Sequence, residues 1–208
     1  MLDVLGQCLA FVWSGWTATW PTQLLAIIWI VWVISWVVAS SWSGRTQKHV
    51  MTWDSRRYRI PILLGAVLFT PWTGRVLEEK PIWQFGSLGI YVLAGLTIAG
   101  ISFTWWARIH LGRFWSNAIT HKEGHQVIDT GPYGLVRHPI YTGLITGMLA
   151  TGVAVGTVTA LLGAALISLG MWQKARMEEV FLGVELGADA YGSYRRRVPM
   201  LVPFVPPR

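Results

Sequence analysis

The chain has 208 residues, of which 53% are hydrophobic and 13% are charged, and its formal net charge is +7. A soluble domain carries roughly 25% charged residues, so this composition excludes an ordinary soluble protein and indicates a membrane protein. The basic residues lie in loops beside apolar segments, where orientation and anionic headgroups explain them, so we expect membrane lipids and no nucleic acid as partners. The single cysteine, Cys8, excludes an internal disulfide and a cysteine zinc site.

The first part of the chain contains three predicted spans. Residues 1–20 are apolar but lack the basic start of a secretory signal, so we expect them to stay attached as an interfacial segment. A bilayer core of about 30 Å needs about 20 apolar residues of helix, and residues 22–42 and 84–107 meet this requirement. Between them, residues 56–73 are expected to form a helix whose basic start lies at the membrane interface.

The second part contains a predicted helical hairpin. From His138 to Gln173 there is no formal charge over 36 residues. As one helix this run would reach about 54 Å at 1.5 Å per residue, which is too long for one span. Because Gly152 to Gly156 supplies a break, we predict two helices, at about 139–154 and 156–180, the second of which runs on into the cytoplasm.

The distribution of basic residues predicts the orientation. Residues 43–59, residues 108–138 and the chain from Lys174 onward hold every Lys and Arg except Arg75 and Lys80. By the positive-inside bias these three regions are cytoplasmic. The sequence therefore predicts an all-α integral membrane protein of about five transmembrane helices, with the N-terminus outside, the C-terminus cytoplasmic and the location a bacterial inner membrane.

A polar break before the hairpin and an acidic pair after it form the candidate site. Titratable groups are costly beside a bilayer, so their presence where two spans meet indicates function. Both groups fall on the cytoplasmic side of the predicted layout. The break contains Gly131, Pro132, Tyr133, Val136, Arg137, His138, Pro139, Tyr141 and Gly143, and the pair is Glu178 and Glu179.

These residues belong to an ordered set of motifs that spans residues 108–204. The set comprises Leu111-Gly112-Arg113, Gly131-Pro132-Tyr133, Arg137-His138-Pro139-Ile140-Tyr141 with Gly143, and, after the hairpin, Glu178-Glu179 with Leu182, Gly187, Tyr191, Tyr194, Arg197, Val198-Pro199 and Pro203. In this order the set resembles the isoprenylcysteine carboxyl methyltransferase family and the related membrane phospholipid N-methyltransferases. The resemblance covers about the C-terminal half of the chain.

The resemblance implies S-adenosylmethionine as methyl donor. The length leaves room for one domain, and no Pro, Gly or Ser-rich linker divides it, so we expect a single domain over residues 1–208, with N-terminal spans in 1–107 and a cofactor-binding part in 108–208. Family members often have Arg at position 174, four residues before Glu178, which leaves open whether Lys174 or Arg176 contacts the substrate, because the two cations are not interchangeable. By positional match, the cofactor residues are His125, Gln126, Val127, Ile128, Tyr133, His138, Pro139, Ile140, Tyr141 and Glu178.

The side-chain chemistry agrees with this cofactor. Glu178 can hold the ammonium of the donor, and His138 with backbone amides at the start of the hairpin helix can hold its carboxylate. Tyr133 and Tyr141 offer aromatic faces that attract a sulfonium. Methyl transfer depends on alignment and exclusion of water, but an amine, thiol or hydroxyl acceptor would benefit from a base, for which Glu179 or His138 could serve. The catalytic candidates are Lys174, Arg176 and Glu179.

Structural interpretations of the same residues remain open. Arg137 and His138 could anchor a helix end at the interface. The two glutamates could form a solvated helix face, bridged to Lys174 and Arg176 by i, i+4 and i, i+3 spacing.

The remaining features favour structural roles. A basic run near the C-terminus is expected to contact lipid headgroups. Three glycines of the third span are expected to pack against another helix, and a Trp stripe in the first span to face lipid or pack against another span. Histidines outside the motif lack partners at metal-ligand spacing, so we expect no metal. These residues are Arg195–Arg197, then Gly89, Gly95 and Gly100, then Trp29, Trp32 and Trp36, and finally His49, His110 and His121.

The sequence thus predicts a membrane enzyme that moves a methyl group from S-adenosylmethionine to a lipophilic acceptor. A prenylated cysteine carboxylate and a phosphatidylethanolamine-type amine are both open as acceptors. A non-catalytic membrane scaffold that keeps the fold is a further alternative. A transporter is disfavoured, because the sequence has no inverted repeat and no charge deep in a predicted span.

Overall fold

The described part of the chain is helical, as the sequence predicts. A computed structural model describes residues 20–39, 48–49, 55–112, 120–121, 128–185 and 188–205. Two short segments, β1 (Lys48–His49) and β2 (Thr120–His121), form an antiparallel pair. The helices are α2 (Trp20–Ala39), α3 (Ser55–Leu68), α4 (Pro71–Val76), α5 (Ser87–Leu111), the 3-10 helix η3 (Gly131–Gly134), α6 (Pro139–Val155), α7 (Val158–Glu185) and α8 (Ala188–Arg197).

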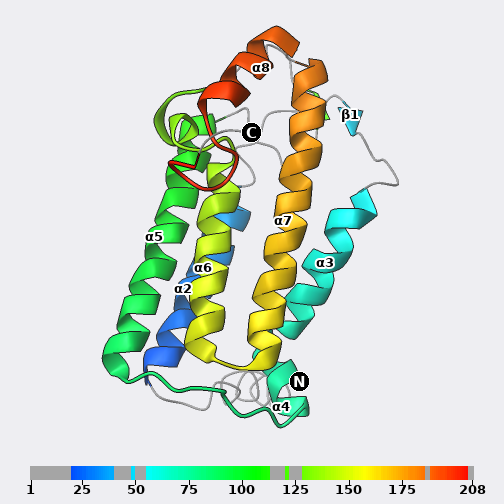
Figure 1. The fold of residues 1–208 in the computed structure, drawn as a ribbon. Coiled ribbons are helices and arrows are strands. Elements are labelled where there is room, and N and C mark those ends of the chain that lie inside the picture. Colours follow the sequence, from blue (N-terminus) through cyan, green and yellow to red (C-terminus); the bar gives the residue numbers. More distant parts are fainter. Residues whose placement is uncertain are drawn as a thin grey trace.

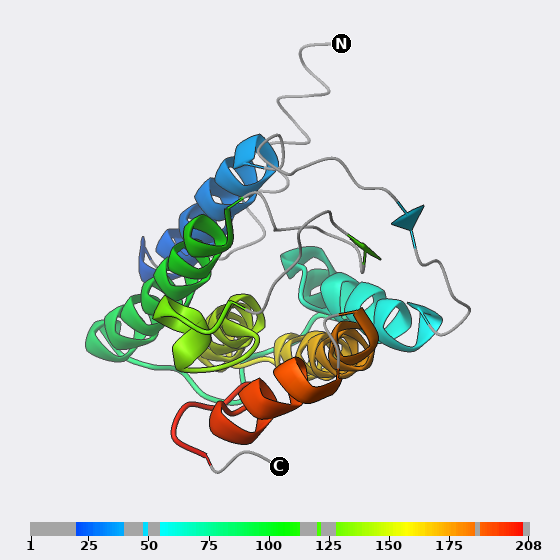
Figure 2. The same ribbon diagram turned by 90° about the horizontal axis from the view of Figure 1, so that it is seen from above.

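The long helices stand side by side as a bundle with two distinct ends (Figure 1). Helices α3 and α6 begin, and α5 and α7 end, at the end that carries η3 and α8. The other end carries α4 and the turn between α6 and α7. Seen from above, α2, α5, α6, α7 and α3 follow one another in a curved row, each in contact with the next (Figure 2).

Within the described residues, the predicted spans coincide with observed helices, with one exception. Residues 40–42 of the first predicted span and residues 1–19 of the expected interfacial segment lie outside the described residues. Residues 56–73 form two helices, α3 and α4, because Pro71 disfavours helical geometry in the residue before it, and Thr70 is extended with φ −73° and ψ 142°. By length and composition, Ser87–Leu111 and Val158–Val184 could cross a membrane, and Gln23–Ala39 and Pro139–Val155 are shorter apolar helices. The five-span layout and its sidedness stay predictions.

The hairpin turn falls within the predicted break. Gly156 follows α6 with φ 70°, and its N–H donates to the Gly152 carbonyl at 2.9 Å. A left-handed glycine after the last helical residue is a common helix end. A Cβ on Gly156 would also lie 2.9 Å from the Trp83 carbonyl oxygen, so both the backbone angle and the close approach require glycine here.

Glycine contacts bring neighbouring helices together. A Cβ added to Gly100 of α5 would lie 2.5 Å from the Gly143 carbonyl oxygen of α6, and one added to Gly65 of α3 would lie 2.7 Å from the Gly163 carbonyl oxygen of α7. Small residues at such positions let two membrane helices approach closely. Of the glycines that the sequence assigns to packing in the third span, Gly100 meets another helix, whereas a Cβ on Gly95 would meet nothing within 4 Å. The third, Gly89, would meet the Phe85 side chain.

The Trp stripe of α2 packs against other helices. Trp36 lies edge-on to Trp105 of α5, with ring centroids 5.5 Å apart, and Trp29 Nε1 donates to Thr151 Oγ1 of α6 at 3.0 Å. Trp32 stacks on Trp36 at 5.4 Å. Of the two expectations for this stripe, contact with lipid or packing against another span, the structure shows packing against other helices.

Large apolar side chains cover the outside of the bundle. Val37 of α2 and Leu63 of α3 are each 65% exposed, and Leu88 of α5 is 78% exposed. Exposed apolar side chains on several helices are typical of a surface that contacts lipid or a partner. It agrees with the membrane class that the composition indicates.

Candidate functional site

The candidate site lies where the start of α6, the end of α7 and the chain after α8 meet. The backbone N–H groups of Arg137 and His138 donate to the carbonyls of Pro199 and Met200, at 2.8 and 3.1 Å. Pro139 occupies the first turn of α6, where its missing N–H is no loss. The segment that follows α8 is therefore fixed beside the start of α6.

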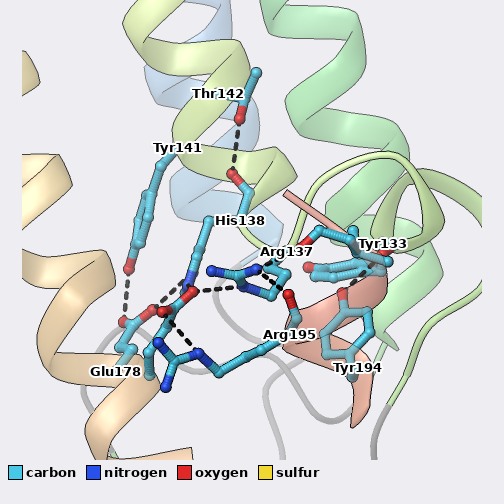
Figure 3. A network of polar contacts seen from close by, with 10 residues as sticks. Tyr133, Arg137, His138, Tyr141, Thr142, Glu178, Tyr194 and Arg195 are labelled. Atoms are coloured by element: carbon cyan, nitrogen blue, oxygen red, sulfur yellow. Dashed lines mark hydrogen bonds and ion pairs between the residues drawn. The ribbon is translucent and has the colours of Figure 1, made fainter. Parts of the chain in front are cut away.

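Glu178, near the end of α7, joins side chains of the pre-hairpin motif (Figure 3). Tyr141 Oη donates to Glu178 Oε1 at 2.6 Å, and His138 Nδ1 lies 3.5 Å from Glu178 Oε2. The His138 and Tyr141 rings stack, with centroids 5.6 Å apart and an interplanar angle of 9°. Lys174 Nζ lies 3.9 Å from Glu178 Oε1. The structure thus brings together the two groups that the sequence places on either side of the hairpin.

Glu179 has different partners from its neighbour. Arg137 Nε donates to Glu179 Oε1 at 2.6 Å, and Arg137 Nη1 donates to the carbonyls of Arg195, at 3.0 Å, and Val198. Arg195 Nε lies 3.6 Å from Glu179 Oε2. Arg137 is 5% exposed and Glu179 is 4% exposed. A buried ion pair is costly to break, because the remaining charge loses its partner. This pair therefore ties α7 to the segment just before α6 and to the chain around α8.

The structural alternatives for these residues are only partly correct. Glu179 is buried, so the two glutamates do not form a solvated helix face. Lys174 does approach Glu178, but the Arg176 guanidinium lies 5.4 Å from the centroid of the Trp172 ring on the same helix.

His138 lies between the two carboxylates. It is 7% exposed, and its Nε2 lies 3.5 Å from Glu179 Oε1 without a well-formed hydrogen bond within the described part of the chain. Burial by itself would lower the pKa of His138, but contacts with Glu178 and Glu179 outweigh it and raise this pKa above its ordinary value. The imidazole is therefore more readily protonated than a free histidine, which suits it to donate hydrogen bonds rather than to act as a base.

Tyr133 is held by contacts of its ring and its backbone. Its carbonyl accepts the Tyr194 hydroxyl at 2.7 Å, and its ring stacks on His110 with centroids 6.3 Å apart. Burial raises the pKa of Tyr133, and the nearby Tyr194 and Glu178 raise it further, so the hydroxyl stays protonated. Gly131, with φ 57°, allows this turn, since a Cβ there would lie 2.8 Å from the His110 ring.

The remaining predicted site residues differ in burial, and three of them lie outside the described part of the chain. Ile128 and Ile140 are half-buried, and Pro139 is buried. Within the described residues, no group of three or more His, Cys, Asp or Glu side chains could hold a metal ion. His125, Gln126 and Val127 lie outside the described residues.

Sequence reasoning missed two features of the site. Tyr58 of α3 lies 5.9 Å from Lys174 Nζ, measured to the ring centroid, and no spacing in the sequence relates the two residues. Arg195 Nε lies 3.6 Å from Glu179 Oε2 and Arg197 pairs with Asp129 at 2.9 Å, contacts that the sequence did not indicate, while the expected contact of this basic run with lipid headgroups stays a prediction. The motif signalled that Arg137 was unusual, but only the fold identifies Glu179 as its partner.

Comparison with known proteins agrees with the motif. Residues 93–183 match the isoprenylcysteine carboxyl methyltransferase (ICMT) family, a segment that includes most of α5, all of α6 and most of α7. The segment contains both Arg137-His138-Pro139 and Glu178-Glu179.

Individual relatives match longer stretches of the chain than this segment. A protein-S-isoprenylcysteine O-methyltransferase from Schizosaccharomyces pombe is 32% identical over 106 residues, which cover 48% of this chain and 43% of that protein. Methanethiol S-methyltransferase 1 from Bradyrhizobium diazoefficiens is 32% identical over 153 residues, 67% of this chain and 51% of that protein. Protein-S-isoprenylcysteine O-methyltransferase B from Arabidopsis thaliana is 28% identical over 160 residues, 73% of this chain and 76% of that protein.

The chain spans about half the length of the first two relatives. The matched part nevertheless contains the two groups that meet in the structure, the loop before the hairpin and the end of its second helix. The family match, the relatives and the predicted motif order agree, and residues 93–183, which hold the site, resemble the isoprenylcysteine carboxyl methyltransferase family.

Proposed function

We propose that this chain is an integral membrane methyltransferase that transfers a methyl group from S-adenosylmethionine to a lipophilic acceptor. The observation that carries the proposal is the 2.6 Å hydrogen bond from Tyr141 to Glu178, with His138 stacked on Tyr141. It joins an aromatic and cationic turn to a carboxylate, which together complement a small molecule with a cationic centre and an amino-acid end. The relatives above are named as methyltransferases, which supports the reaction class.

The residues at this point fit the proposed donor, with one change from the sequence-based expectation. The backbone amides of Arg137 and His138 donate to Pro199 and Met200, so they are not available to a donor carboxylate. The first helical turn still offers the N–H groups of Ile140 and Tyr141, which have no intrahelical partner.

Further roles in donor binding follow the motif. Glu178 would hold the donor ammonium, and the Tyr141 and Tyr133 rings would lie near its sulfonium. His125, Gln126, Val127, Ile128, His138 and Pro139 are proposed to complete the wall. The donor supplies an already activated methyl group, so the chain itself has to align the acceptor and exclude water.

The three catalytic candidates have different surroundings. Lys174 is half-buried beside Glu178 and is our proposed contact for the acceptor, whereas Arg176 is exposed and lies against Trp172. Glu179 is engaged by Arg137, so we propose that it positions Arg137 and His138 and does not act as a base.

The surroundings of these groups favour one class of acceptor. The described site has no carboxylate free to take a proton, and His138 is held toward its protonated form. A carboxylate acceptor is already ionised at neutral pH and needs no base, whereas an amine is protonated there. We therefore favour an acceptor that carries a carboxylate, such as a prenylated cysteine. A phospholipid amine is the second candidate, and a thiol is a third, since one relative is named for methanethiol.

We further propose that the chain crosses the membrane five times as one domain, with residues 108–208 as the cofactor-binding part and the site at the cytoplasmic face of a bacterial inner membrane. The support is the distribution of charge. The start of α3 carries Arg56, Arg57 and Arg59, and α8 carries Arg195–Arg197, both at the end of the bundle where the site lies. Cytoplasmic loops carry such an excess of Lys and Arg.

Mass spectrometry of methyl transfer tests the reaction. The purified protein in detergent would be mixed with S-adenosylmethionine and either an S-farnesylcysteine derivative or phosphatidylethanolamine. We expect a methyl ester on the farnesylcysteine carboxylate, with a rate that does not climb steeply between pH 7 and 9. A rate that climbs through this range, with methylation of the amine, would favour the second candidate.

Substitutions at the site, with a control far from it, separate an enzyme from a scaffold. Glu178→Gln should abolish product formation. Glu78→Gln, at an exposed glutamate that lies just after α4 and whose backbone N–H bonds back to it, should leave product formation unchanged. If Glu178→Ala and His138→Ala both kept every activity of the folded protein, the scaffold alternative would be correct.

A further inference from the structure

Helix α3 lies outside the segment that matches the family, yet it contributes to the site. It packs along α7 in the opposite direction (Figure 1), with Gly65 opposite Gly163 and the Tyr58 backbone opposite Gly170. A Cβ added to Gly170 would lie 2.7 Å from the Tyr58 carbonyl oxygen. Gly170 precedes Lys174 on α7 by four residues. The close approach of Tyr58 to Gly170 therefore places Tyr58 about one helical turn along α7 from Lys174.

The Lys174 ammonium lies within 6 Å of two aromatic rings. Its Nζ is 5.9 Å from the centroid of the Tyr58 ring and 5.5 Å from that of the Tyr141 ring. Tyr58 is only 9% exposed, so its ring is held by the packing of α3 on α7. An ammonium within about 6 Å of an aromatic face is attracted to it, and more strongly where water is excluded. A lysine side chain has a flexible four-carbon stem, so its ammonium can occupy many positions unless other groups hold it. The two rings and the Glu178 carboxylate together would restrict the position of this charge.

We propose that Tyr58 is a positioning residue that fixes the Lys174 ammonium for an anionic lipophilic acceptor. The inference rests on the proposed function, because it assigns the acceptor end of that same site. Tyr58 comes from α3, so recognition of the acceptor extends beyond residues 93–183, the matched segment.

Paired variants at two tyrosines test this role by kinetics. Tyr58→Phe keeps the ring, and Tyr58→Leu removes it. With an S-farnesylcysteine derivative as acceptor, Tyr58→Leu should lower kcat/KM roughly threefold to thirtyfold, mainly through a higher KM, and Tyr58→Phe should stay within about twofold of the wild type. The Kd for S-adenosylhomocysteine should be unchanged in both.

Tyr91 of α5 supplies the matched control, because it is 45% exposed. Tyr91→Leu and Tyr91→Phe should leave both constants at the wild-type values. Equal losses in Tyr58→Leu and Tyr58→Phe, or a loss of S-adenosylhomocysteine binding in Tyr58→Leu, would overturn the positioning role.

A spectroscopic measurement decides the geometry without any activity. Reductive methylation with ¹³C-formaldehyde keeps the positive charge of lysine and labels the side chains of Lys48, Lys80, Lys122 and Lys174. We expect the Lys174 signal, assigned by its loss in Lys174→Arg, to be shifted upfield by the two rings. Tyr58→Leu should move it toward the other lysine signals, and Tyr58→Phe should not.

The two proposals fail in different ways. An unchanged Lys174 signal in Tyr58→Leu would contradict the role of Tyr58 whatever the enzyme does. Absence of S-adenosylhomocysteine binding by the wild-type chain would contradict the proposed function, while the lysine signal would still report whether Tyr58 positions Lys174.

Discussion

Both ends of the helix bundle hold a glutamate against another element, but with different partners. At the end with α4, Glu79 Oε2 accepts the N–H of Thr159 at 3.2 Å and also its hydroxyl, at the start of α7. At the other end, Glu178 and Glu179 meet a phenol, an imidazole, an ammonium and two guanidiniums. Neutral donors at a helix start describe a cap, whereas coupled titratable groups from three segments of the chain are typical of a functional site. A glutamate thus anchors a helix start at one end of the bundle, whereas the glutamates at the other end belong to the candidate functional site.

Removal of the buried guanidinium should have the largest effect on stability. Arg137→Met leaves the Glu179 carboxylate buried without its closest partner, so we expect unfolding in detergent to become easier by about 3–5 kcal/mol. Replacement of both partners, as Arg137→Met with Glu179→Met, should recover part of this loss without restoring methyl transfer. Denaturant titration followed by Trp fluorescence measures both.

An exposed pair at the same end gives the control. Arg197 contacts Asp129 with its side chain 64% exposed, so Arg197→Met should cost less than about 1 kcal/mol. If Arg197→Met were as destabilising as Arg137→Met, burial would not distinguish the two pairs and the anchoring role of Arg137 would be wrong.

Disruption of the close contact between helices α5 and α6 should have the next largest effect on stability. Gly100→Ala places a Cβ 2.5 Å from the Gly143 carbonyl oxygen, and separating α5 from α6 should cost about 1–3 kcal/mol. Gly95→Ala, on the same helix but facing open space, should instead be neutral or stabilising by up to about 1 kcal/mol. Thermal unfolding of both variants checks this difference, and equal midpoints would contradict the packing described for α5 and α6.

The cap at the other end should affect stability alone. Glu79→Gln weakens the contacts with Thr159, so we expect a loss of about 0.5–2 kcal/mol, the range for a lost helix cap. Methyl transfer per folded molecule should equal that of the wild type, as measured by product formation normalised to folded protein. A specific loss of activity in Glu79→Gln would remove the distinction between the two ends.

Protonation of His138 should give a smaller, pH-dependent effect. Its pKa is raised in the folded chain, so its contribution to stability is complete below the ordinary value of about 6.5 and is lost as pH rises through the raised pKa. Stability should therefore fall with rising pH, by at most about 1.4 kcal/mol per pH unit from this group. Unfolding titrations above pH 6 should show this slope in the wild type and in His110→Gln, but not in His138→Gln.

The sequence predicted the helices better than the contacts between them. Long apolar runs define α2, α5 and the α6–α7 hairpin, and glycine marks the turn at Gly156 because the chain needs a left-handed residue there. The break between α3 and α4 was also signalled, by Pro71, but hydropathy alone carried the predicted helix across it.

The site was predictable only where its residues share a motif. The approach of His138 and Tyr141 to Glu178 follows from a helical hairpin whose second helix is the longer one, so that α7 returns past the start of α6. The position of Tyr58 depends on how α3 packs against α7, and that packing has no local signature. The choice of Arg137 as partner for Glu179 likewise depends on which face of α7 turns toward α6.

Isothermal titration with S-adenosylhomocysteine tests the central claim, that the turn of His138 and Tyr141 and the tip of α7 bind one adenosyl ligand. We expect saturable binding by the folded wild-type protein in detergent and by Glu79→Gln. Glu178→Gln should bind more weakly by about 2–5 kcal/mol, because a charge partner of the ligand is removed. Equal affinity in Glu178→Gln and Glu79→Gln, or no binding by the wild type, would contradict the account.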